Sequence, residues 1–147
     1  IVNLDFAARV GLRYLDHVRP LANEAIDQYI CETALGQTAR LEGEAQYSLC
    51  ETVMLVRGMK LISRVLTHRS PLVFPPDLSP MGLEVNPRFL GEANLHAMLD
   101  TDGFSDKREQ FSVDAVRSHL NAIHDVISNA FHSIVTEHAH AMWDRDL

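Results

Sequence analysis

Hydrophobic and other residues alternate from Ala8 to Tyr14, in the first part of the segment 8–18. Successive side chains of an extended strand point to opposite faces, so a period of two places the apolar residues together on one side. That side carries Ala8, Val10, Leu12 and Tyr14, and the other carries Arg9, Gly11 and Arg13. The pattern predicts a first strand with one apolar face and one face that presents two arginines.

The period becomes helical in the segment 20–36. Pro20 is suited to the start of a helix, and Gly36 is suited to its end. The apolar positions between them fall on one helical stripe, at Leu21, Ala25, Ile26 and Tyr29. We therefore expect a short helix after the first strand.

A period of two returns in the segment 44–69. One face of its first half holds Ala45, Tyr47, Leu49, Val53 and Leu55, and Glu51 alone interrupts this face. The sequence Arg57-Gly58-Met59 is suited to a tight turn, which favours a β-hairpin. A helix is the competing interpretation, because several residues here, such as Glu51 and Met54, are also good helix formers.

Five of the six prolines lie in the segment 70–92. Proline cannot donate to a hydrogen-bonded ladder and disrupts helices, so this segment is expected to form a long surface loop. The following segment, 94–106, predicts a short strand that ends in an acidic turn at Asp100, Asp102 and Gly103.

The last element has the clearest pattern. Ser112 is a suitable N-cap, and Asp114 lies in the first turn, where the helix dipole favours negative charge. Apolar residues then recur every three or four positions, at Val113, Val116, Leu120, Ile123, Ile127, Ala130 and Ile134. A helix running unbroken to Trp143 would be about 48 Å long, whereas a domain of this size has a radius of gyration of about 15 Å. The helix must therefore break, protrude, or lie along something larger.

Length, composition and charge fit one globular domain spanning residues 1–147. Hydrophobic residues make up 46% of the 147 residues, and the net charge of −7 disfavours non-specific binding to nucleic acid. The two cysteines match no metal or redox spacing and are expected to be reduced. Since no signal peptide or membrane-spanning run is apparent, we expect a cytoplasmic location and no membrane partner. The chain starts without Met, so we expect it to be the C-terminal part of a longer protein.

Three stretches resemble a sporadically distributed bacterial family of uncharacterised proteins. They are "RVGLRYLDHV", "LHAMLDTDGF" and "SHLNAIHDVISNAFHSIVTEHAHAMW". The matching positions are Arg9, Gly11, Leu12, Arg13 and Tyr14, then Leu99, Asp100 and Asp102, and then Leu120, His124, Phe131 and Thr136. The resemblance implies that this chain corresponds to the C-terminal half of such a protein, and it implies no activity.

The arginines of the first strand are the first candidate site. If the first and last strands are neighbours, Arg9 and Arg13 face Asp100 and Asp102, and arginine pairs well with carboxylate across strands. One interpretation is an ion-pair lattice that holds the sheet together. The alternative is a binding site for an anionic ligand or a phosphate, to which arginines on rigid strands are suited.

Other chemistry is less well supported by the sequence. Arg117 and His124 lie seven residues apart on one helix face, a spacing similar to that of the active pair of some metal-independent ribonucleases. The histidines of the last helix lack the spacing of a zinc site, and "TDGFSD" lacks that of a calcium loop. No cofactor and no metal site are expected.

The sequence therefore predicts an α+β fold, with an antiparallel sheet of about four strands, a short helix after the first strand and a long C-terminal helix. The first functional hypothesis is a non-enzymatic protein-interaction or assembly module. It would associate with a second copy or with a missing N-terminal half through the helix residues Val116, Leu120, Ile123, Ile127 and Ile134. The alternative is a protein that processes an anionic ligand or nucleic acid.

Overall fold

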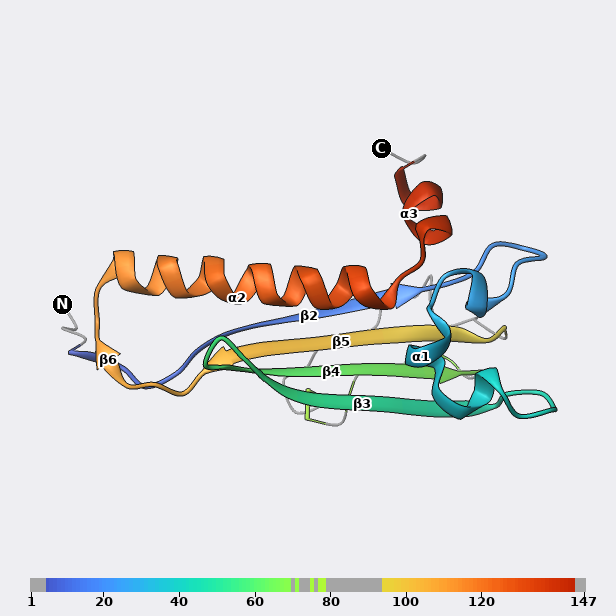
Figure 1. Cartoon of the computed structure of the whole chain (residues 1–147), viewed down its shortest axis with the longest axis horizontal. Helices are drawn as coiled ribbons and strands as arrows, with labels where there is room; N and C mark the ends of the chain where they lie inside the picture. Colours follow the sequence, from blue (N-terminus) through green and yellow to red (C-terminus); the bar gives the residue numbers. More distant parts are fainter. Residues whose placement is uncertain (1–4, 70, 72–74, 76, 79–93, 145–147) are drawn as a thin grey trace.

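The computed structural model describes residues 5–69, 71, 75, 77–78 and 94–144. A four-stranded antiparallel sheet with the strand order β2-β5-β4-β3 forms its base (Figure 1). The strands are β2 (Val10–Val18), β3 (Tyr47–Val56), β4 (Met59–His68) and β5 (His96–Ser105), and the short strands β1 (Phe6–Ala7) and β6 (Glu109–Gln110) pair with each other. The predicted fold class, the first strand and the hairpin are confirmed.

The central strand β5 corrects one prediction. Asp100, Asp102 and Gly103 lie within this ten-residue strand, not in a turn after it. β5 is paired with β2 through residues 97–105 and with β4 through residues 96–104. The carboxylates of Asp100 and Asp102 are compatible with a central strand because arginines from neighbouring segments pair with them.

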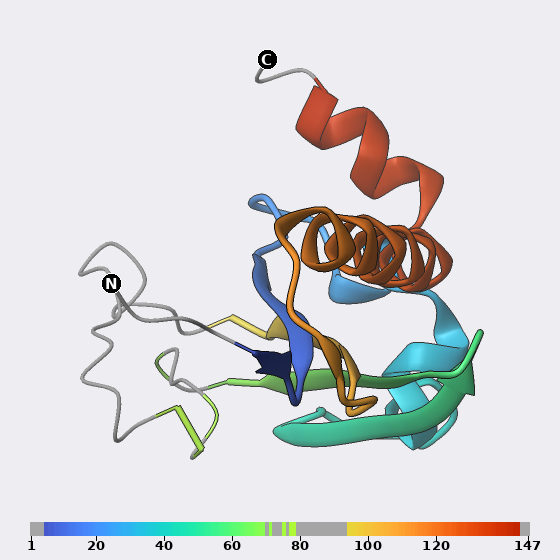
Figure 2. The same ribbon diagram turned by 90° about the vertical axis from the view of Figure 1, so that its left-hand side faces the viewer.

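The helix α2 (Val113–Ile134) lies along one face of the sheet (Figures 1 and 2). Its own residues Ile123, Val126 and Ile127 are buried. The helix packs tightly over Gly103, where an added Cβ would lie 2.9 Å from Ile123 Cγ2 and 3.0 Å from Ile127 Cγ1. A side chain at position 103 would push the helix away from β5, so glycine is needed for this close packing.

The expected long helix breaks at Val135, which has extended backbone angles. Ser112 is its N-cap, as predicted, and accepts a hydrogen bond from the Ala115 amide at 3.0 Å. Beyond the break, Thr136 caps a second helix, α3 (Glu137–Trp143), which turns away from the sheet (Figure 1). Of the three outcomes considered for the helix, the break is the one observed.

The segment 20–36 does not form the single helix that its pattern predicts. It contains η1 (Ile26–Gln28) and α1 (Glu32–Leu35), followed by η2 (Gly36–Ala39). The interruption has a tertiary cause. Ile30 forms a β-bridge with Val135, and the Cys31 amide donates to the Ile134 carbonyl at 2.8 Å, which holds the backbone extended between η1 and α1.

The predicted loop 70–92 falls mainly outside the described residues. Residues 71, 75 and 77–78 are its described part, and Asp77 contacts the sheet through Arg13.

Candidate functional site

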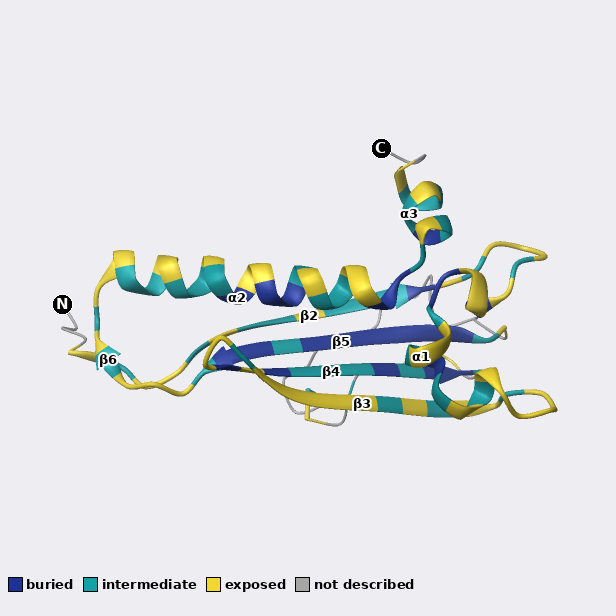
Figure 3. Ribbon diagram, in the orientation of Figure 1, coloured by how far each residue is buried: buried dark blue, intermediate teal, exposed yellow. Residues whose placement is uncertain are grey.

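The outer edge of β3 is the most exposed apolar part of the described sheet (Figure 3). Leu49 is 50% exposed, Val53 53% and Leu55 77%, and Tyr47 and Met54 are also exposed. No described strand pairs with this edge, because β3 is the last strand in the sheet order. The face that alternation identified at positions 45–55 is thus apolar but not covered.

A two-residue turn fixes how β3 presents its backbone. Arg57 and Gly58 both have positive φ, at 52° and 79°, which is the signature of the type I′ hairpin turn. In such a hairpin the flanking pair, here Val56 and Met59, faces inward and exchanges hydrogen bonds. The backbone groups of every second residue before Val56 also point toward β4. The amides and carbonyls of the intervening residues therefore point away from β4, at the open edge of the sheet.

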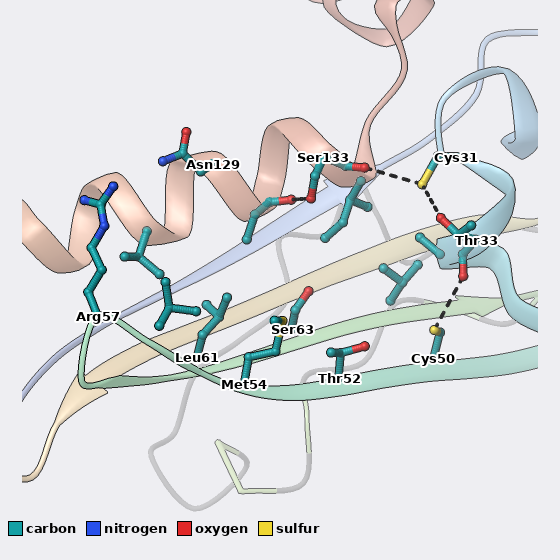
Figure 4. A pocket seen from close by; sticks show the side chains of 16 residues that line it. Cys31, Thr33, Cys50, Thr52, Met54, Arg57, Leu61, Ser63, Asn129 and Ser133 are labelled. Atoms are coloured by element: carbon teal, nitrogen blue, oxygen red, sulfur yellow. Dashed lines mark hydrogen bonds between the residues drawn. The ribbon is translucent and has the colours of Figure 1, made fainter.

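A groove of about 430 Å³ lies between α2 and β3 on the helix-covered face (Figure 4). It forms because α2 packs mainly over β5, β2 and β4, whereas β3 is contacted by the short elements α1 and η2. Arg57 lies at one end of the groove, and the free thiols of Cys31 and Cys50 lie at the other. Both sulfurs contact Thr33, at 3.3 Å to its Oγ1 and 3.9 Å to its carbonyl oxygen.

On the opposite face, an ion-pair ladder crosses all four strands. Asp100 is buried at its centre and accepts hydrogen bonds from Arg13 of β2 at 2.7 and 2.8 Å and from Arg64 of β4 at 3.0 Å. Arg64 also binds Glu51 of β3, and Arg13 binds Asp77. The Arg13–Asp100 contact confirms that the first and last predicted strands are neighbours.

The charges of this ladder are already compensated. Hydrogen bonds to Asp100 and Asp77 raise the pKa of Arg13 above its ordinary value, and the hydrogen bond from Arg13 lowers the pKa of Asp77. Burial, opposed by the attraction of Arg9, raises the pKa of Asp102. Arg9 lies 3.7 Å from Asp102 and also stacks on the Phe104 ring. These contacts favour the ion-pair lattice over an open anion site.

Three histidine rings pack together near one end of the same face. His17 Nε2 lies 2.7 Å from His96 Nδ1, and the centres of the His68 and His96 rings are 4.1 Å apart. Burial lowers the pKa of His68, and the neighbouring His96 lowers it further. This cluster was not identified from the sequence, because its members come from three strands.

The lowered pKa of His68 predicts that the protein loses stability on mild acidification. Below about pH 6.5 an unfolded His68 binds a proton, while the folded one resists it, so the unfolded state is favoured as the pH falls. Urea denaturation at pH 7.5 and 5.5 should show a loss that His68→Gln reduces. His124→Gln is the control, since that side chain is exposed, and an unchanged pH dependence in His68→Gln would contradict the prediction.

Arg117 and His124 each have an acidic neighbour on α2. Arg117 lies 3.4 Å from Asp114, and His124 lies 3.8 Å from Asp125 and contacts the edge of the Tyr14 ring. Both residues are exposed. The geometry adds nothing that favours a catalytic role for this pair.

The predicted interface residues of the helix lie largely inside their own chain. Ile123, Ile127 and Ile134 are buried, and Val116 and Leu120 are half-buried. Ile123 and Ile127 pack with Met59 and Leu61 of the sheet. Their apolar spacing is therefore explained by intrachain packing.

The edge of β3 is the surface that sequence reasoning missed. Its signal was present, because Met54 makes both faces of segment 53–55 apolar, which is unusual for a strand with one solvated face. Alternation alone does not tell which face of a strand is covered.

No family model, curated protein or solved structure matches this chain. No helix among the described residues is both long and apolar enough to cross a membrane. Within the same part of the chain, no group of three or more His, Cys, Asp or Glu side chains is arranged to hold a metal ion.

Proposed function

We propose that the chain is a non-enzymatic protein-interaction module that accepts a strand from its partner along the outer edge of β3. The observation that carries this proposal is a ten-residue edge strand with exposed apolar side chains on both faces. Proteins usually protect such edges with charges, prolines or short strands. β3 has Glu51 as its only charged residue and contains no proline.

Strand addition matches the chemistry of this edge. Outward backbone groups supply main-chain hydrogen bonds, and the side chains Leu49, Val53 and Leu55 supply apolar contact. The surface proposed from the sequence, on the C-terminal helix, is less suitable, because Ile123 and Ile127 are already buried. The arginine face is also less suitable for binding a partner, since the Arg13 guanidinium already forms ion pairs with Asp100 and Asp77.

Site-specific photocrosslinking tests the proposal. A photoreactive amino acid replaces Leu55 in the protein as it is made in its own cells, and Val113 is replaced in the same way as the control. Val113 is also aliphatic and is 63% exposed, but it lies on α2. We expect a covalent protein adduct at position 55 and none at position 113. No adduct at 55, or equal adducts at both positions, would contradict strand addition at β3.

A further inference from the structure

β3 has the properties needed to pair with a second copy of itself. When two identical antiparallel strands are related by a twofold axis perpendicular to their sheet, opposite side chains lie on the same face. Side chains alternate between the two faces along a strand. The axis must therefore lie where one residue is opposite the same residue of the other copy, and it cannot lie midway between two consecutive residues of a strand. We propose that two copies of this chain pair β3 to β3, antiparallel, with the axis at Thr52. This inference rests on the proposed function, because it names the strand that β3 accepts.

The outward backbone groups suit this arrangement. The backbone amides and carbonyls of Met54 and Val56 point toward β4. Those of the alternating residues point the other way, toward the second copy, and these residues are Leu49, Glu51, Val53 and Leu55. A Thr52-centred pair matches these four residues with one another and forms about eight main-chain hydrogen bonds.

The side chains also match in this register. Leu49 lies opposite Leu55 of the second copy at both ends, and Thr52 lies opposite Thr52 at the centre. Glu51 lies opposite Val53, and its charge is compensated by Arg64 of its own chain. Aliphatic and threonine pairs of this kind stabilise an antiparallel sheet.

Neighbouring registers are less favourable. An axis at Glu51 places two carboxylates opposite each other, and an axis at Val53 places Glu51 opposite Leu55, the most exposed apolar residue of the strand. An axis at Cys50 places Leu49 opposite Glu51, and an axis at Met54 pairs only residues 52–56. The registers at Glu51 and Thr52 have equally long overlaps, and of these two only the Thr52 register avoids opposed carboxylates.

The perpendicular axis also determines the shape of the pair. It joins the two sheets into one of eight strands and keeps both α2 helices on the same face. The groove beside each β3 then lies next to that of the other copy across the axis. Neither α2 is displaced, since the helix packs over the other three strands.

Cysteine cross-linking distinguishes the registers and makes use of the native Cys50. In the Thr52 register Cys50 lies opposite residue 54, at a non-hydrogen-bonded pair with a Cα separation of about 4.5 Å, which falls within the range of disulfides. With Cys31→Ser in every variant, mild oxidation of Met54→Cys should give a covalent dimer. Met54→Cys combined with Cys50→Ser should remain uncross-linked, as should Cys50 alone and the exposed control Val113→Cys.

Charge substitutions test the same register by solution mass. Light scattering should give the unmodified chain twice its monomer mass of 16.5 kDa. Leu49→Lys with Leu55→Lys places like charges opposite each other and should give a monomer. Leu49→Lys with Leu55→Glu places opposite charges across the axis and should restore the dimer. Both positions are exposed, so circular dichroism should show an unchanged fold.

The outcomes separate this inference from the proposed function. Cross-linking through Cys50 alone or in Met54→Cys with Cys50→Ser overturns the Thr52 register. A monomeric unmodified chain overturns the pairing of two copies. If residue 55 then still cross-links to a different protein in cells, strand addition at β3 stands and only the second copy is wrong. If that adduct is also missing, both proposals fail.

Discussion

Replacing Ile123 with aspartate is expected to unfold the protein. Ile123 is fully buried, and its Cγ2 packs against the backbone at Gly103 of β5. A carboxylate placed there has no cation to pair with among the residues of its cluster, which are aliphatic or Met. The substitution should lower the free energy of unfolding by an amount on the order of 5 kcal/mol, which is comparable to the whole stability of many domains. Circular dichroism and urea denaturation measure the effect.

Val113→Asp is the matched control for this substitution. It makes the same chemical change on the same helix, but Val113 is exposed. Its free energy of unfolding should stay within about 0.5 kcal/mol of the unmodified protein. If Ile123→Asp instead stays folded and only its solution mass falls, the helix is an interface between chains and its packing on the sheet is not essential.

Local patterns predicted the elements whose stabilising contacts are local. The Ser112 cap, the strand from Val10 and the hairpin around Arg57 and Gly58 were all foreseeable, because capping, alternation and turn chemistry involve neighbouring residues. The position of Arg13 beside the acidic strand was also foreseeable, since opposite charges on two amphipathic strands favour their pairing.

Long-range contacts account for what the sequence did not indicate. The segment 20–36 has helical spacing, but Ile30 is held extended by Val135, which lies more than a hundred residues away in the chain. Asp100 resembled a turn residue because nothing local shows that two arginines from different strands enclose it. The open edge of β3 follows from the strand order and from the path of α2, and neither is encoded in β3 itself.

The ion-pair ladder leads to the second large effect. Asp100→Asn should destabilise the protein by about 3 kcal/mol, because it removes the charge that Arg13 and Arg64 share in a buried position. The loss is moderated by Asp77 and Glu51, each of which still pairs with one of these arginines.

Asp102→Asn is the control substitution with which the stability loss of Asp100→Asn is compared. Asp102 lies two residues further along β5 on the same face, but its Arg9 partner is exposed and 3.7 Å away, and burial raises the pKa of Asp102. Burial disfavours the charged form of Asp102, so little stabilisation is lost when the substitution removes that charge. The free energy of unfolding at pH 7 should change by less than about 0.5 kcal/mol. Urea denaturation of both variants at pH 7 and moderate salt measures the difference. Equal losses would mean that Asp100 is no more important than any half-buried carboxylate on this face. A large loss for Asp100→Asn alone would identify the arginine face as part of the fold, in agreement with the proposal that a partner binds elsewhere, at the edge of β3.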